Sequence, residues 1–370
     1  MGGGLRRVAV SPSHGSRPDR ATGRRCGESL TRLTHTLGSV YQLVECVPNI
    51  SEGRRPSVVD AIVDAVLRVP GVTLLDRTSD ADHDRSVLTL VGVADTVLLA
   101  MQVVASQAIA RIDLRSQHGQ HPRIGALDVV PFVPLGDTSM DTCIELAGRF
   151  GAWLAEVYTL PVYLYARAAR RPDRRILADI RHPSFEGLGA ALAAEDGAPD
   201  FGPQRAHPTA GATVVGARPF LIAWNIQLET GELAIARRIA TTIRERDGGL
   251  SGVQALGIPL AAAGCVQVSM NLLDHQRTPM WQVFERVRDL AAAGGVALRD
   301  TELIGLAPLR AFLDVADHAG VPNTHSTDGR VRAAAQWLQI RDATSQMALE
   351  LRLAARLAAT GRPAGNPAAD

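Results

Sequence analysis

Two histidines share a short polar segment with an arginine and an aspartate. Residues 116–128 are Ser-Gln-His-Gly-Gln-His-Pro-Arg-Ile-Gly-Ala-Leu-Asp, which places His118, His121, Arg123 and Asp128 close together. An imidazole exchanges protons near neutral pH, so either histidine could act as a general base or acid. A surface loop with two solvated histidines accounts for the same residues. A metal site would need a third ligand and outer hydrogen-bond partners, which the segment does not supply.

A second polar cluster, Asp80-Ala-Asp-His-Asp-Arg85, stands before an apolar run that begins at Val87. Its three carboxylates and His83 could bind a hard cation. The glycine and the closing glutamate of an EF-hand loop are absent, so a solvated turn is the simpler interpretation. Arg85 could clamp a carboxylate with its forked guanidinium group.

A third segment combines glycines and prolines with polar side chains. It contains Asp200-Phe-Gly-Pro203, followed by His207-Pro-Thr-Ala-Gly-Ala212. Such a backbone can approach a flat ligand closely, because glycine has no side chain and proline fixes its own turn. A plain linker explains the segment equally well.

The composition excludes several classes of enzyme. All 39 basic residues of the 370-residue chain are arginines, and none is a lysine. A Schiff-base lysine, a pyridoxal-phosphate enzyme, a Walker-type phosphate loop and a kinase active site are therefore excluded. Any cation that holds a substrate carboxylate must be an arginine or a protonated histidine. The net charge of +1 and the 4% of aromatic residues give no indication of a nucleic-acid partner.

The cysteines and the apolar runs indicate an ordinary globular protein without a membrane span. The four cysteines, at positions 26, 46, 143 and 265, form no CxxC pair, which favours buried free thiols in a reducing compartment. The uncharged stretch 248–273 is interrupted by Pro259 and several polar residues, so it predicts two buried strands and a turn. Residues 1–40 hold seven arginines and only two acids, which is typical of a disordered extension, although a transit peptide has a similar composition.

From residue 41 the hydrophobic periodicity predicts the same order of elements twice. That order is strand, helix, strand, strand, helix, strand, the pattern of a ferredoxin-like unit. In the first unit we expect strands at 42–48, 72–76, 87–92 and 126–133 and helices at 57–69 and 94–111, followed by a helix at 139–158 and a strand at 162–165. In the second unit we expect strands at 220–228, 253–260, 266–271 and 302–306 and helices at 231–246 and 279–293.

The predicted fold class is α/β (α+β), with two ferredoxin-like βαββαβ subdomains. Each sheet carries helices on one face, so the two remaining faces can pack toward each other with a ligand cleft between them. The predicted limits are an extension at 1–40, a first subdomain at 41–217 that ends in a linker at 181–217, a second subdomain at 218–320 and a C-terminal helical tail at 321–370. In the tail we expect one helix over 331–357 and disorder over 361–370.

Five blocks of this sequence resemble glutamate formiminotransferase, which is also the first half of formiminotransferase-cyclodeaminase. The blocks follow one another in register: Val44–Gly53, His121–Asp128, Pro161–Tyr165, Ala198–Pro203 and Asn271–Asp274. The likeness runs from about residue 42 to residue 316. It implies two α/β subdomains with a folate-binding tunnel between their sheets, in a cytoplasmic homodimer. We expect transferase activity alone, because the chain ends too early for a cyclodeaminase half.

The resemblance implies transfer of a formimino group from N-formimino-L-glutamate to tetrahydrofolate, a step of histidine breakdown. The catalytic histidine of the family corresponds to His121, and Asp128 could orient its ring. Arg85, Arg123 and Arg218 are the candidates to hold the carboxylates of the two substrates. The implied folate-binding residues are Gly202, Pro203, Gln204, Arg205, Ala206, His207, Pro208, Thr209, Ala210 and Gly211, with Leu250, Gln254 and Gly257 in a second stretch. No resident metal is implied; tetrahydrofolate is a co-substrate.

The segment before His121 departs from the family pattern. The family usually has His-Lys-Gly-Glu-His-Pro-Arg, whereas this chain has Gln117, His118 and Gln120 where the family has its first histidine, its lysine and its glutamate. An Asn-Arg pair of the family is Asp84-Arg85 here. The site is therefore less positive. Two alternatives follow: a folate enzyme with another one-carbon donor, such as a formyl group, or a folate-binding protein without turnover.

Overall fold

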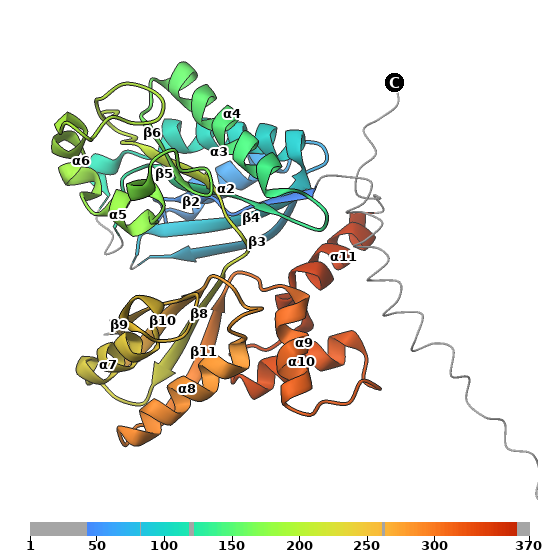
Figure 1. Ribbon diagram of the computed structural model, residues 1–370. Coiled ribbons are helices and arrows are strands. Elements are labelled where there is room, and N and C mark those ends of the chain that lie inside the picture. Colours follow the sequence, from blue (N-terminus) through green and yellow to red (C-terminus); the bar gives the residue numbers. More distant parts are fainter. Residues whose placement is uncertain (1–42, 82, 118–121, 261–262, 361–370) are drawn as a thin grey trace, which may run out of the picture.

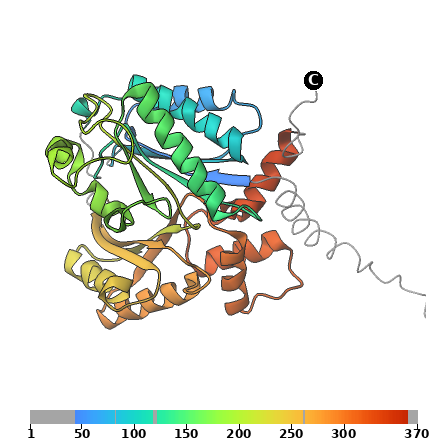
Figure 2. The same ribbon diagram turned by 45° about the horizontal axis from the view of Figure 1, so that its top comes forward.

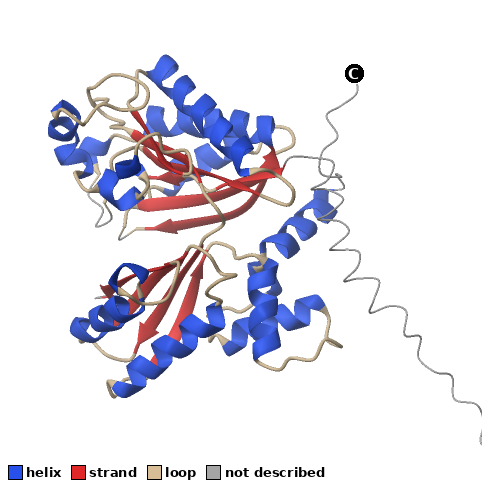
Figure 3. Ribbon diagram, in the orientation of Figure 1, coloured by secondary structure: helices blue, strands red, loops and turns tan. Residues whose placement is uncertain are grey.

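The computed structural model describes residues 43–81, 83–117, 122–260 and 263–360. The expectations for residues 1–40 and 361–370 lie outside these ranges. The chain is a mixed α/β protein with one seven-stranded and one four-stranded sheet (Figures 1 and 3). Within the described ranges, no helix combines the length and the apolar character that crossing a bilayer requires.

The first sheet has an antiparallel part and a parallel part. In its antiparallel part, β3 pairs with β4, and both β1 and β2 lie between β4 and β5. The parallel pairs β5–β7 and β7–β6 extend the sheet. Pro48 separates β1 from β2, because proline has no N–H to donate to the ladder. The bounds are β1 Leu43–Cys46, β2 Asn49–Ile50, β3 Thr73–Asp80, β4 Arg85–Val93, β5 Leu127–Pro134, β6 Val162–Ala166 and β7 Thr213–Ala217.

Three amphipathic helices cover one face of this sheet: α2 (Pro56–Val66), α3 (Ala94–Arg111) and α4 (Met140–Tyr158). In Figure 1 they lie on the side of the first sheet that is away from the second sheet. The predicted ranges 94–111 and 139–158 agree with α3 and α4. The Ser139 hydroxyl accepts a hydrogen bond from the Thr142 amide at 3.1 Å and so caps α4.

The predicted linker at 181–217 is wrong, because this range holds secondary structure. The short α5 (Leu177–Arg181) is followed by α6 (Ser184–Ala193), whose Leu188 and Leu192 pack on the opposite face of the sheet. The buried strand β7 then inserts between β5 and β6. A five-residue inner strand is apolar on both faces, so it carries no alternation that a sequence pattern could detect.

The second sheet is antiparallel throughout, in the order β11, β8, β10, β9. Its strands are β8 Ile222–Leu228, β9 Val253–Leu260, β10 Cys265–Leu272 and β11 Leu298–Ile304. The helices α7 (Leu233–Ile243) and α8 (Met280–Ala293) lie on its far side in Figure 1. Trp224 of β8 is fully buried and stacks on Phe284 of α8, with ring centroids 6.2 Å apart.

Two α-helices, α10 (Thr327–Trp337) and α11 (Leu349–Thr360), occupy the described part of the predicted tail in place of the single helix expected over 331–357, and α9 (Leu309–His318) precedes them. The chain leaves the helical path after α10 because Thr301 of β11 donates its amide to Gln339 and accepts from the amide of Arg341, at 2.9 and 2.8 Å. Gln339 takes a positive φ of 56° at this turn.

Helix α11 connects the two halves (Figures 1 and 2). Leu349 and Leu353 pack with Leu75 and Val91 of the first sheet. The Arg352 guanidinium donates to the Leu75 carbonyl at 3.1 Å. Its Nη1 also lies 3.6 Å from a carboxylate oxygen of Asp76 in β3.

We expect Arg352→Ala to lower the free energy of unfolding by about 1 kcal/mol, the usual contribution of one partly buried hydrogen bond with an ion pair. Chemical denaturation measures it. Arg332→Ala, at an exposed position of α10, is the control and should change it by less than about 0.5 kcal/mol. Equal effects of the two changes would show that Arg352 does not hold α11 on the first sheet.

Candidate functional site

His118 and His121 lie outside the described residues, so the site is built from what surrounds them. Gln117 precedes the undescribed residues 118–121, Pro122 and Arg123 follow them, and Arg123 joins the two ends. Its Nη2 donates to the Gln117 carbonyl at 2.6 Å and to a carboxylate oxygen of Glu186 in α6 at 3.1 Å. The guanidinium is buried, and its Nε has no partner among the described residues. Arg123 therefore fixes both ends of the predicted catalytic segment.

Glu52 holds the same segment from the other side. Its side chain is fully buried, and each of its oxygens accepts hydrogen bonds. Oε1 accepts from the amides of Arg54 and Arg55 at the start of α2, and Oε2 accepts from Arg55 Nε at 2.6 Å and from Gln117 Nε2 at 3.2 Å. Sequence reasoning missed Glu52, although it stands in the Val44–Gly53 block that carries the family resemblance.

Asp128 is a buried carboxylate whose two oxygens are bound within the protein. Oδ1 accepts from the amides of Ile124 at 2.8 Å and Gly125 at 3.2 Å. Oδ2 forms an ion pair with the Arg181 guanidinium of α5. Asp128 thus fixes the backbone that follows the predicted base, and it recruits Arg181, which sequence analysis had not selected.

Arg85, at the start of β4, belongs to the same charge cluster. Burial and the neighbouring Arg181 lower the pKa of Arg85 to about 10, while Asp128 and Asp80 oppose that shift. The side chain therefore remains cationic at neutral pH. Asp80 also accepts from His83, with Nδ1 2.6 Å from Oδ2. Asp82, the middle carboxylate of the predicted cation cluster, lies outside the described residues; among the described residues, no group of three or more potential metal ligands occurs.

The predicted folate loop, Gly202–Gly211, lies beside this segment. Thr209 and Ala210 accept backbone hydrogen bonds from Leu114 and Ala126, at 2.9 and 3.0 Å. Gly211 has a φ of +69°, and a Cβ there would stand 2.0 Å from the Ile124 oxygen, so only glycine allows this approach. His207 Nδ1 accepts from the Ala210 amide at 3.0 Å and closes the loop. The structure thus brings this loop and the flanks of His121 together.

Arg218 lies on the first sheet near two buried groups. Burial raises the pKa of Glu45 in β1 to about 8, while Arg218 opposes the shift, so this carboxyl is largely protonated at neutral pH. Burial also raises the pKa of the Tyr165 hydroxyl, which Arg218 hydrogen-bonds. One oxygen of Glu45 is buried without a partner among the described residues.

The Glu45 carboxyl gives a testable pH dependence of stability. The native state holds this proton up to about pH 8, whereas the unfolded chain releases it near the ordinary value of 4.5. The native state binds more protons in this window, so the free energy of unfolding falls as the pH rises, by up to about 1.4 kcal/mol per unit. Denaturation at several pH values should show this slope in the wild type and its absence in Glu45→Gln; parallel curves would contradict the assignment.

Comparison with known proteins assigns the family. A profile described as "Formiminotransferase domain, N-terminal subdomain" matches residues 43–218, and one described as "Formiminotransferase domain" matches residues 223–347. The chain belongs to the formiminotransferase family. The glutamate formimidoyltransferase of Streptococcus pyogenes is 42% identical over 277 residues, which cover 75% of this chain and 93% of that protein.

Two further relatives differ in how much of their own length this chain matches. The glutamate formimidoyltransferase of Thermoplasma acidophilum is 45% identical over 278 residues, 75% of this chain and 91% of its own length. The formimidoyltransferase-cyclodeaminase of Rattus norvegicus is 44% identical over 282 residues, 74% of this chain but 52% of its own length.

The second predicted folate stretch of this formiminotransferase chain lies in the other half of the molecule. Gln254 is exposed on β9, and Leu250 packs against the core of the second sheet. Gly257 faces α7, where a Cβ would stand 2.5 Å from the Arg237 nitrogen. Gly257 therefore permits close packing of α7 on the sheet.

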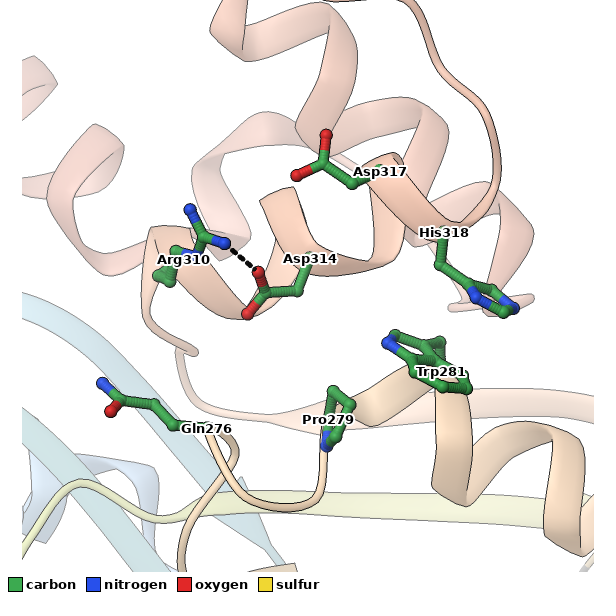
Figure 4. Close-up of a pocket in the computed structure, with 7 residues that line it drawn as sticks. All are labelled: Gln276, Pro279, Trp281, Arg310, Asp314, Asp317 and His318. Atoms are coloured by element: carbon green, nitrogen blue, oxygen red, sulfur yellow. Dashed lines mark ion pairs between the residues drawn. The ribbon is translucent and has the colours of Figure 1, made fainter.

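A hollow of about 760 Å³ also occurs in the second half, between α8 and α9 (Figure 4). The His318 ring stacks on Trp281 at 4.0 Å, and Arg310 forms an ion pair with Asp314 at 2.6 Å. None of the predicted site residues lines it. Its lining is Gln276, Pro279, Trp281, Arg310, Asp314, Asp317 and His318.

Proposed function

We propose that this chain is a glutamate formiminotransferase. It transfers the formimino group of N-formimino-L-glutamate to N5 of tetrahydrofolate and releases L-glutamate, as a step of histidine breakdown. The observation that carries this proposal is the match to two proteins named glutamate formimidoyltransferase over more than nine-tenths of their length, at 42% and 45% identity. The hydrogen-bonded frame around the His121 segment supports the same reaction.

His121 is the general base of the proposed reaction. N5 of the folate attacks the amidine carbon, and the imidazole takes the N5 proton as the tetrahedral intermediate forms. The bond from that carbon to the glutamate nitrogen then breaks, and the imidazolium returns the proton to the departing amine. One neutral imidazole serves both steps because its ordinary pKa lies close to neutrality.

The arginines supply the positive charge that both substrates need. Arg85 and Arg181 both lie close to the buried carboxylate Asp128, and Arg181 forms an ion pair with it. The Nε atom of Arg123 has no partner among the described residues and provides a further donor. Arg218, which lies near Glu45 and Tyr165, is a further candidate to hold a substrate carboxylate. Arginine suits this task because its fork binds carboxylates with charge-assisted bonds.

The proposal includes the finer architecture of the family. The strand orders β3-β4-β1-β5 and β11-β8-β10-β9 support two ferredoxin-like units. The outer placement of the helices supports sheets that face each other across a folate cleft. We propose subdomains at 41–217 and 218–320 with a tail at 321–370, although α10 shares the core of the second sheet. A cytoplasmic homodimer rests on the family resemblance alone.

The direct test mixes purified protein with tetrahydrofolate and N-formimino-L-glutamate and follows 5-formiminotetrahydrofolate by absorbance. Glutamate release, measured in parallel, should match folate product one to one. A reaction with N-formyl-L-glutamate but not with the formimino donor would replace the proposed donor. Folate binding by calorimetry without turnover of either donor would favour a binding protein.

A further inference from the structure

Three buried polar atoms around Asp128 have no partner among the described residues: Gln117 Oε1, Arg123 Nε and Arg181 Nε. Two sets of bonds, joined through the chain between Arg123 and Ile124, hold their residues. Arg123 donates to the Gln117 carbonyl at 2.6 Å, Asp128 accepts from the Ile124 amide at 2.8 Å, and Arg181 pairs with Asp128. A buried polar atom without a partner is costly and needs an explanation. Gln117 Oε1 is the acceptor among these three atoms, and an N–H group of a bound ligand would satisfy it.

The orientation of the Gln117 amide is fixed by Glu52. The Oε2 atom of Glu52 lies 3.2 Å from Gln117 Nε2, and every other partner of that carboxylate is also a donor. The NH₂ end of the amide must therefore face Glu52, because a carboxylate oxygen accepts. The Oε1 atom is turned away from Glu52 and accepts no hydrogen bond from the described residues. Gln117 is 5% exposed, so the side chain has little room to rotate.

The two candidate one-carbon donors differ at one atom. The formimino group ends in a nitrogen that carries hydrogen, whereas the formyl group ends in an oxygen that only accepts. A fixed acceptor binds the first and repels the second. Sites that hydrogen-bond a substrate group discriminate strongly against analogues that lack it, because a buried group is then left unpaired.

We propose that Gln117 selects the one-carbon donor, because its Oε1 accepts a hydrogen bond from the terminal N–H of the formimino group. The inference rests on the proposed formiminotransferase function and names the residue that sets its donor specificity. The family usually has a histidine at this position. A histidine ring nitrogen can accept or donate according to its tautomer, whereas Gln117 presents an acceptor only. This chain should therefore be stricter toward formimino donors than Gln117→His.

The test compares kcat/KM for N-formimino-L-glutamate and N-formyl-L-glutamate in wild type, Gln117→Leu and Gln336→Leu. We expect Gln117→Leu to lower the value for the formimino donor by about 10- to 100-fold and to leave the value for the formyl donor unchanged or raise it. Gln336 is exposed on α10, so its variant should match wild type. The tetrahydrofolate Kd should not change. Equal losses for both donors, or no loss, would overturn the proposal.

Two further arms keep the result interpretable. Glu52→Gln gives Gln117 a partner that can also donate, so the amide can turn and the donor preference should fall even if Gln117→Leu does not fold. If wild type transfers neither group, the proposed function fails. Calorimetric binding of the two donors to wild type and Gln117→Leu then tests the inference alone. A formimino preference that Gln117→Leu loses supports it, and no preference, or no binding, overturns it.

Discussion

We expect His121→Ala to lower kcat for formimino transfer by about 10²- to 10⁴-fold, the usual contribution of a positioned general base. Tetrahydrofolate binding should persist, because the loop and the arginines assigned to it do not include His121. The wild-type kcat should fall at acidic pH, where the imidazole takes up a proton and can no longer act as a base. The variant should lack this limb of the pH profile. Stopped-flow absorbance with both substrates saturating measures kcat directly.

His325→Ala is the matched control, since His325 is exposed in the second half of the molecule. Its kcat should equal that of wild type. A variant at His121 that turns over at the wild-type rate would remove the proposed base. His118 would then be the next residue to change, because it is the other histidine of the same segment.

The long periodic helices could be predicted from the sequence, and the short buried elements could not. The predicted 94–111 agrees with α3, and the predicted 279–293 differs from α8 by one residue. The prediction of a linker over 181–217 was wrong because α6 is rich in alanine and glycine and β7 is apolar on both faces, so neither shows a clear periodicity. The break after α10 depends on Thr301, a partner of Gln339 that lies far from it in the sequence.

The same limit applies to the site. Sequence analysis selected Arg85, Arg123 and Asp128 because each stands in or beside a motif. It missed Glu52 and Arg181, whose roles come from partners 65 and 53 residues away in the chain. Contacts between residues so far apart in the chain depend on the fold. Glu52 could have been selected because it stands in a block that carries the family resemblance, whereas nothing in the sequence pointed to Arg181.

The second large effect concerns stability, and we expect Asp128→Ala to lower the free energy of unfolding by about 3–5 kcal/mol. The substitution leaves the Arg181 guanidinium buried without its carboxylate, and it leaves the amides of Ile124 and Gly125 without an acceptor. Activity should fall as well, because those amides follow directly on the segment that carries the proposed base. Chemical denaturation and the absorbance assay measure the two effects on the same samples.

A double variant, Asp128→Ala with Arg181→Leu, separates the ion pair from the backbone contacts. The double variant has no buried cation without a partner, so its free energy of unfolding should be higher than that of Asp128→Ala alone. The control is Asp95→Ala, which breaks an exposed pair with Arg149 at 3.0 Å and should cost at most about 1 kcal/mol. If Asp128→Ala costs no more than Asp95→Ala, Asp128 does not hold the catalytic segment in place. In that case Asp128→Asn should keep full activity. If the buried ion pair does hold the segment, Asp128→Asn should lose activity.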